Sequence, residues 1–401
     1  MPSRNSRTVR RRGGRRRHNA GSVILLVLMT LLLTAFALTK YLEKTTIDLL
    51  ADAREVRSER LRVEAYSALE NVLAVLQEFQ TVDGTLRSPA EGWGTPLEFA
   101  GYAPLAGLTV GVTLEDESGK ISLPHADFPT LRDLFLVLGE KQTDAERLAD
   151  AMLVWMQPGY EPVDSFSARA TDYERATIPH DPPARSLHSF GELAAIRFVR
   201  DTLYDEQGNP NELWRRFVDS VSLYDFTQPN VNGAADTTLA VLGGYDDTSV
   251  RTITDYLSGL GSYARQGPAY FRNPQDVAGV VGQATNTSRL GAQVACLRVN
   301  VTVHEGPSSF RLSAVVAPPN GAGAPPADPP PPTTDSSTTQ SGADSSTTSA
   351  TTATAAATTA ANTDATGSTA QPALNYPFTL LEIRENDEIV GTIPSSQPTT
   401  E

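Results

Sequence analysis

A basic run directly before an apolar run opens the sequence, and this order constrains the fold more than any other feature. The first 20 residues hold eight arginines and no acidic residue, and the 18 residues from Ser22 to Thr39 carry no charge. A helix of that length spans about 27 Å, close to the thickness of a bilayer's hydrocarbon core. Because basic flanks stay in the cytoplasm, the chain after Lys40 should lie on the far side of the membrane.

Three kinds of N-terminal segment share this order. A cleaved secretory signal peptide would have a shorter apolar core before small residues, but here the charged and bulky stretch from Lys40 to Lys44 follows. An ordinary signal anchor would keep the whole segment. A pilin-type leader would be cut on the cytoplasmic side after a glycine, and Gly21 lies between the arginines and the apolar run. We favour cleavage between Gly21 and Ser22, which leaves the membrane helix on the mature protein.

Apolar residues continue beyond the membrane segment at the three- and four-residue spacing of one helix face. Charged residues such as Arg54 and Glu64 occupy the positions between them. The pattern predicts one long helix to about Thr81, with a hydrophobic first half and an amphipathic second half, as in the spine of pilins. The apolar positions are Val56, Val63, Tyr66, Leu69, Leu73, Leu76 and Phe79.

The body begins with strand character and then changes period. Alternation from Leu108 to Glu115 predicts a strand, and a turn then leads to the returning segment Ile121–Leu123. We interpret the acidic residues of this turn, Asp116 and Glu117, as solvated. Helical spacing follows as far as Gly282, with capping boxes such as Thr143-Asp-Ala-Glu146 marking helix starts.

Strand character returns in the last part of the chain. Leu290–Val303 and Ser309–Ala317 are two strand candidates joined by a short turn that predicts a hairpin. A long stretch rich in Pro and then in Thr and Ala follows, and its composition predicts disorder. Tyr376–Ile383 resumes strand character, either as a last strand of the sheet or as part of a loose tail.

Several of these features together resemble one family, the K-type minor pseudopilin of type II secretion (general secretion pathway protein K). Leu26 is the fifth residue after Gly21, where most pilins have a glutamate and the K-type subunit does not. Asp116-Glu-Ser-Gly-Lys120 and Asn230-Val-Asn232 are similar to two segments of the family, although Gly233 stands where threonine is usual. The long helical stretch within the strands is also typical of the K type.

The resemblance implies an α+β, pilin-like fold. It would combine a long N-terminal transmembrane and amphipathic helix, an antiparallel sheet and a large inserted helical domain. The expected divisions are a basic prepilin leader at 1–21, a transmembrane helix at 22–39, its amphipathic continuation at 40–82, a pilin-like α/β part at 83–126, the inserted helical domain at 127–283, sheet strands at 284–317, a disordered Pro/Thr/Ala-rich insertion at 318–374, and a last strand and tail at 375–401.

The sequence shows no pattern that is typical of an active site, and we predict no catalytic, cofactor-binding or metal-binding residue. The five histidines make no zinc-binding spacing, and neither a nucleophile elbow nor a phosphate-binding loop is present. The one cysteine, Cys296, lies in an apolar run and is interpreted as a small buried hydrophobic residue.

A calcium site is the one metal site that the resemblance implies, in the loop after the helix that ends near Trp155. Gln157 and Arg169 occupy two positions where the family has carboxylates. We therefore interpret the region as a solvated acidic loop, with calcium binding as the alternative. The acidic residues that could still act as ligands are Asp164, Asp172, Glu174 and Asp181.

By this resemblance, the protein is expected to be a minor pseudopilin at the tip of the type II secretion pseudopilus. It would nucleate or cap assembly, aid export across the outer membrane, and sit in the inner membrane with its body in the periplasm. Expected partners are the I and J minor pseudopilins, the major pseudopilin and the prepilin peptidase. Nucleic acid is excluded as a partner, because the formal net charge is -14 even with the arginine-rich start included.

Two other functions remain open from the sequence. A minor pilin of a type IV pilus would have the same helical spine. A single-pass envelope enzyme or binding protein would have an ordinary anchor in place of the leader.

Overall fold

The computed structural model describes residues 20–164, 167, 169–175, 180–282, 287–325 and 378–386. Two compact units divide the chain, at 1–61 and 62–401, and the first helix runs across this boundary. The expectations for the leader before Ala20 and for the Thr/Ala-rich stretch from 326 to 377 lie outside the described residues.

Helix α1 comprises Ala20–Asp83. From Ile24 to Glu59 almost all side chains of α1 are solvent-exposed, including the large apolar ones from Ile24 to Leu50. By length and composition, α1 is the one helix within the described ranges that could cross a membrane. The exposure of so many large apolar groups is expected for a helix whose surroundings are lipid or other helices.

The second unit contains the last part of α1, which does bury an apolar face. Of the predicted apolar positions, Leu69, Leu73 and Leu76 are buried, together with Ala65 and Val72. Val56 and Val63 are exposed, so the buried face begins later than the sequence indicated. Glu64 is also buried, and its carboxylate accepts hydrogen bonds from the Tyr102 hydroxyl (2.7 Å) and the Leu105 amide (3.2 Å). These bonds fix the segment after α1, which contains the short helices η1 (Pro89–Glu91) and α2 (Pro96–Phe99), against α1.

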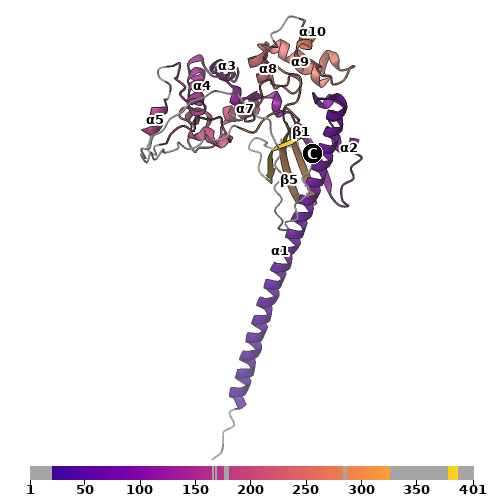
Figure 1. Ribbon diagram of the computed structural model, residues 1–401. Coiled ribbons are helices and arrows are strands. Elements are labelled where there is room, and N and C mark those ends of the chain that lie inside the picture. Colours follow the sequence, from indigo (N-terminus) through magenta and orange to yellow (C-terminus); the bar gives the residue numbers. More distant parts are fainter. Residues whose placement is uncertain are drawn as a thin grey trace, which may run out of the picture. The chain divides into compact units, whose positions relative to one another are not determined.

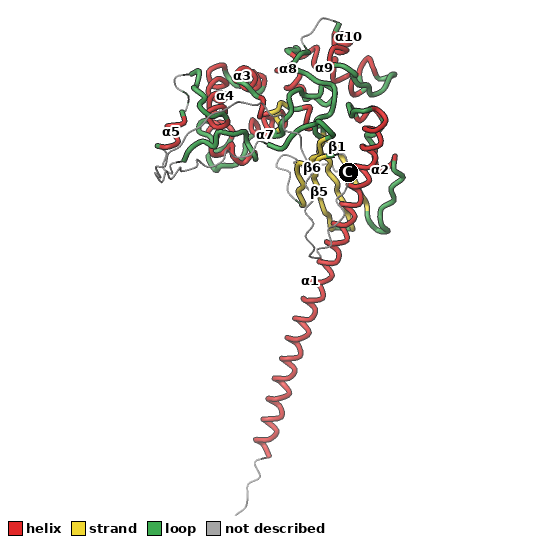
Figure 2. Tube along the Cα trace, viewed as in Figure 1, coloured by secondary structure: helices red, strands yellow, loops and turns green. Residues whose placement is uncertain are grey.

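A four-stranded antiparallel sheet lies beside the last turns of α1 in the second unit (Figures 1 and 2). Its strands, in spatial order, are β1 (Thr109–Glu115), β4 (Leu297–Glu305), β5 (Ser308–Ala317) and β6 (Thr379–Glu385). Residues of β4 alternate between buried and half-buried, which places Val299, Val301 and Val303 in the core. Glu385 of β6 accepts hydrogen bonds from Arg62 Nε (2.9 Å) and the Tyr66 hydroxyl (2.7 Å), so β6 is attached directly to α1.

A helical region separates β1 from β4 in the sequence, although the two strands are neighbours in the sheet. It contains one extensive hydrophobic core, to which Phe135, Met152, Tyr173, Phe217 and Ile253 contribute. Its elements are η2 (Glu117–Gly119), β2 (Ile121–Ser122), η3 (Leu123–His125), α3 (Phe128–Val137), α4 (Gln142–Met156), α5 (Ala170–Glu174), η4 (Phe190–Ala195), α6 (Val199–Leu203), α7 (Glu212–Ser220), β3 (Val221–Ser222), α8 (Asp236–Gly243), α9 (Asp247–Ser258), η5 (Gly261–Tyr263), η6 (Pro274–Asp276) and α10 (Val277–Val281).

The α+β class with a long first helix, an antiparallel sheet and inserted helices is therefore confirmed. The structure differs from the sequence expectation at the returning segment after β1. Ile121 and Ser122 pair in parallel with Val221 and Ser222 of β3 rather than with β1. The turn before them is held by hydrogen bonds from Asn230 and Ala235, which lie more than a hundred residues later in the chain.

Candidate functional site

Two turns that are far apart in the sequence meet where the helical region joins the sheet, and we call this contact the junction. The first turn is Asp116–Lys120, which includes η2, and the second is Asn230–Ala235. The Asn230 amide donates to the Ser118 carbonyl (2.8 Å), and the Ala235 amide donates to the Gly119 carbonyl (3.3 Å). The junction thus joins the two segments that are similar to segments of the family.

Glycine is required on both sides of the junction because the two backbones lie in contact. A Cβ atom at Gly119 would overlap the Gly233 carbonyl and would lie 2.9 Å from the Ala234 nitrogen. A Cβ atom at Gly233 would overlap the side chain of Asp116. The unusual glycine at position 233 is therefore explained by the direct packing of Asp116 against the second turn.

The side chain of Asp116 is half-buried in the junction, and its carboxylate is hydrogen-bonded on both oxygens. Oδ1 accepts from the Ser118 amide (2.9 Å), and Oδ2 accepts from Asn230 Nδ2 (2.6 Å). Burial raises the pKa of Asp116 to about 6, although the Ser118 and Asn230 hydrogen bonds oppose the shift. The interpretation of this turn as solvated is wrong, because residues 230–235, which the local sequence does not contain, cover it.

Glu117 is buried beside Asp116 and is paired with two cations. Its carboxylate accepts from Arg298 Nε of β4 (2.5 Å) and lies 3.3 Å from Lys120 Nζ, which also contacts Glu115 (2.7 Å). Burial alone would raise the pKa of Glu117, but Lys120 and Arg298 outweigh burial and hold that pKa below its usual value. The same contacts raise the pKa values of Lys120 and Arg298. Glu117, Lys120 and Arg298 therefore stay charged, and their ion pairs hold the first turn against β4 of the sheet.

The two asparagines of the second turn extend the junction to other parts of the unit. Asn230 Nδ2 also donates to the Arg87 carbonyl (2.8 Å), in the segment after α1. Asn232 is buried; its Nδ2 donates to the Phe271 carbonyl (3.0 Å), and its Oδ1 accepts from the Phe271 amide (2.7 Å). Because side-chain amides both donate and accept, these two residues hold the segments at Arg87 and Phe271 against the second turn.

The raised pKa of Asp116 predicts a specific pH dependence of the free energy of unfolding. Its pKa is raised in the folded state, so the folded protein is favoured by a protonated Asp116, and this contribution is lost as the pH rises from about 4 through about 6. A shift of this size corresponds to about 3 kcal/mol. We expect the free energy of unfolding to fall more steeply between pH 4 and 7 in the wild type than in the Asp116→Asn variant, measured by urea denaturation. Equal slopes in the two proteins would contradict the shift.

The processing and assembly residues predicted from the sequence lie at the start of α1. Gly21 and Ser22 belong to its first turn, and Leu26 follows on the same helix with a 63% exposed side chain. Cleavage at Gly21-Ser22 and the role of Leu26 remain predictions.

The acidic residues considered as calcium ligands are not brought together. Asp164 accepts from Arg147 Nε (3.0 Å), and Asp172 accepts from the Arg169 amide (2.9 Å) at the start of α5. Glu174 and Asp181 are exposed. Within the described ranges, no group of three or more His, Cys, Asp and Glu side chains is placed to hold a metal ion.

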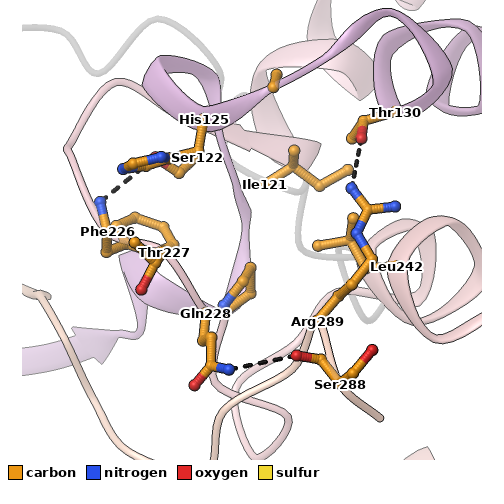
Figure 3. A pocket seen from close by; sticks show the side chains of 12 residues that line it. Ile121, Ser122, His125, Thr130, Phe226, Thr227, Gln228, Leu242, Ser288 and Arg289 are labelled. Atoms are coloured by element: carbon orange, nitrogen blue, oxygen red, sulfur yellow. Dashed lines mark hydrogen bonds between the residues drawn. The ribbon is translucent and has the colours of Figure 1, made fainter. Parts of the chain in front are cut away.

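A cavity of about 390 Å³ lies between η3, the start of α3 and the segment before the second turn (Figure 3). The polar groups around it bond to one another. Arg289 Nη2 donates to Thr130 Oγ1 (2.5 Å), Gln228 Nε2 donates to the Ser288 carbonyl (3.3 Å), and His125 Nε2 lies 2.5 Å from Asp225 Oδ1. Since these groups satisfy one another, they indicate no particular ligand.

Cys296 lies against the junction, and its carbonyl accepts from the Ser118 amide (3.2 Å). Burial, with Glu117 and Asp116 nearby, raises the pKa of its thiol well above the ordinary value. A protonated, buried thiol is a poor nucleophile, so Cys296 has the role of a small core residue that the sequence indicated.

One family model matches part of the chain. Residues 113–207 match the family described as Type II secretion system (T2SS), protein K, which confirms the resemblance drawn from the sequence. The matched range includes the first turn of the junction and helices α3 to α6. No curated protein matches the chain.

One solved structure is similar to the chain in part. It is the GspK-GspI-GspJ complex of the type 2 secretion system from enterotoxigenic Escherichia coli, of which one chain is similar at 14% identity and a TM-score of 0.47. The similarity covers 67% of the present chain and 93% of that chain.

Proposed function

We propose that this protein is a minor pseudopilin that nucleates or caps the pseudopilus at its tip. Its residues 113–207 match the type II secretion protein K family. The family match carries the proposal. It is supported by an N-terminal helix with an exposed apolar surface long enough to span a bilayer. Such a helix suits insertion into the inner membrane and then packing against the helices of other subunits.

The position at the tip is supported by the place of the helical region within the sheet-bearing unit. The region is inserted between the neighbouring strands β1 and β4, so it forms part of the sheet-bearing unit rather than a terminal appendage. A bulky region fixed in this way would obstruct continuous stacking of identical subunits. A subunit at the end of the filament has no such constraint on its upper side.

The missing glutamate at the fifth mature position is consistent with the same role. In most pilins that carboxylate pairs with the N-terminal amine of a neighbouring subunit, since an unpaired charge in lipid is costly. Leu26 occupies the position here and is apolar. A subunit at the tip would need no such pair.

We propose as partners the I and J minor pseudopilins, with the major pseudopilin below them and the prepilin peptidase as processing enzyme. The body would lie in the periplasm. The work of the protein is then assembly, nucleating or capping the pseudopilus and aiding export across the outer membrane, rather than catalysis.

The proposal predicts peptidase-dependent processing at one glycine. The full chain expressed with a prepilin peptidase should start at Ser22, and without the peptidase it should start at Met1, as measured by N-terminal sequencing and intact mass. Gly21→Leu should abolish processing, whereas the matched Gly14→Leu variant should leave it unchanged.

Two outcomes would contradict this function. A Met1 start in both strains would make the segment an ordinary anchor. Normal processing with copurification of pilus minor pilins, in place of the I and J types, would assign the protein to a type IV pilus.

A further inference from the structure

We propose that the segment following α4 is ordered by the buried carboxylate of Asp150 and holds no calcium ion. The segment comprises residues 157–164 together with Ser167. It lies in the region where resemblance to the K type implies a calcium loop. The proposal is independent of the pseudopilin function, because it concerns how this segment is held in place.

Asp150 is the centre of the arrangement. It lies on α4, is completely buried, and accepts four hydrogen bonds from the following segment. Oδ1 accepts from the Tyr160 hydroxyl (2.8 Å) and the Val163 amide (3.0 Å). Oδ2 accepts from the Asp164 amide (2.8 Å) and Ser167 Oγ (2.9 Å). Each carboxylate oxygen therefore has two donors, which fills its hydrogen-bonding capacity.

The groups that surround Asp150 are hydrogen-bond donors, which indicates that the segment is arranged around a negative charge. A calcium ion is surrounded by six to eight oxygen atoms that present lone pairs. Around Asp150 the segment instead presents N–H and O–H groups, which stabilise an anion and would repel a cation. Burial and the hydrogen bond to Asp150 raise the pKa of Tyr160, so its hydroxyl keeps the proton that it donates.

Two carboxylates of the region are engaged with other groups, and two that the family has are replaced. Asp164 forms an ion pair with Arg147, on the turn of α4 before Asp150. The exposed side chains of Gln157 and Arg169 stand at the two positions where the family has carboxylates, and a guanidinium cannot be a ligand. Asp172 accepts from the Arg169 amide at the start of α5. The group of residues present does not fit calcium.

Binding of calcium to the full-length wild-type protein in detergent is the first test. The measurements are terbium luminescence and the thermal midpoint Tm in calcium and in EDTA. We expect no saturable terbium signal that calcium displaces, and the same Tm in both solutions. A calcium-displaceable terbium signal with a higher Tm in calcium would overturn the proposal.

Variants then test the role of Asp150. Asp150→Asn should lower the Tm in EDTA and calcium alike, and should speed proteolytic cleavage after α4 by about tenfold, because Asn places an amide against two of the four donors. Asp181→Asn, which removes an exposed candidate ligand, is the matched control and should behave as wild type. If Asp150→Asn does not fold, the wild-type calcium titration still decides the question. Unchanged proteolysis in a folded Asp150→Asn protein would also overturn the proposal.

Discussion

Replacing Gly119 with alanine is expected to destabilise the folded body by about 3 kcal/mol or more. The added methyl group would overlap the Gly233 carbonyl and press on the Ala234 nitrogen. Both are backbone atoms, so no side-chain rotation can relieve the overlap. The two turns would have to separate, and the hydrogen bonds from Asn230 to Ser118 and from Ala235 to Gly119 would lengthen or break.

Gly111→Ala is the matched control for this substitution. Gly111 lies in β1, a few residues before the junction, and a Cβ atom there would meet nothing within 4 Å. Adding the methyl group at this position should leave stability equal or slightly higher, because alanine restricts the unfolded chain more than glycine does. Urea denaturation of the two variants beside the wild type makes the comparison. Equal stabilities of Gly119→Ala and wild type would mean that the two turns do not touch.

Replacing Glu117 with alanine is the second substitution with a large expected effect, a loss of about 3 to 5 kcal/mol. The variant would leave the half-buried guanidinium of Arg298 without its carboxylate partner, and Lys120 with only one of its two acidic partners. An uncompensated buried charge is costly because the surroundings replace its hydration poorly.

Glu115→Ala is the matched control, because it removes the exposed acidic partner of Lys120 and leaves the buried partner, Glu117, in place. Glu115 contacts Lys120 at 2.7 Å, but its side chain is 47% exposed, so its loss should cost less than about 1 kcal/mol. The double variant Glu117→Leu with Arg298→Leu should lose less than the sum of the two single changes, since it removes both buried charges together. Additive losses in chemical denaturation would show that Glu117 and Arg298 are not coupled.

Local periodicity was enough to anticipate the long elements of the fold. Helix α1 has apolar residues at helical spacing over many turns, and Leu69, Leu73 and Leu76 are buried as that spacing predicts, whereas Val56 and Val63 are exposed. The β4–β5 hairpin has alternating residues on both sides of a short turn, and Val301 pairs with Leu312 as alternation requires. In both cases the residues that determine the element lie within it.

The junction could not be anticipated in this way. Asp116-Glu-Ser-Gly-Lys120 has the composition of an exposed turn, and its burial depends on Asn230–Ala235, more than a hundred residues away. The parallel pair of β2 and β3 is two residues long, which is too short for any period. The one available signal was that both turns belong to segments with family resemblance, and resemblance does not say that the segments touch.

For the expected calcium loop, the sequence showed which family carboxylates are missing, but it did not show which residue organises the segment instead. Gln157 and Arg169 were visible in the sequence as departures from the family's carboxylates. The residue that organises the segment instead, Asp150, lies within a helical pattern, where an acidic residue is ordinarily expected to face water. Only the tertiary structure shows that it is completely buried and surrounded by donors.

The adjacency of β1 and β4 has a consequence for the order in which the chain can fold. The β4–β5 hairpin closes through a short turn, whereas the β1–β4 ladder requires the whole inserted region to be closed as one loop. Closing a loop of that length costs about 3 to 4 kcal/mol of chain entropy more than closing a tight turn. The ladder should therefore form late, after the helices have collapsed and brought their two ends together. Until then β1 has an unpaired edge open to wrong partners, and a subunit released from the membrane insertion machinery would be most exposed to aggregation during that interval.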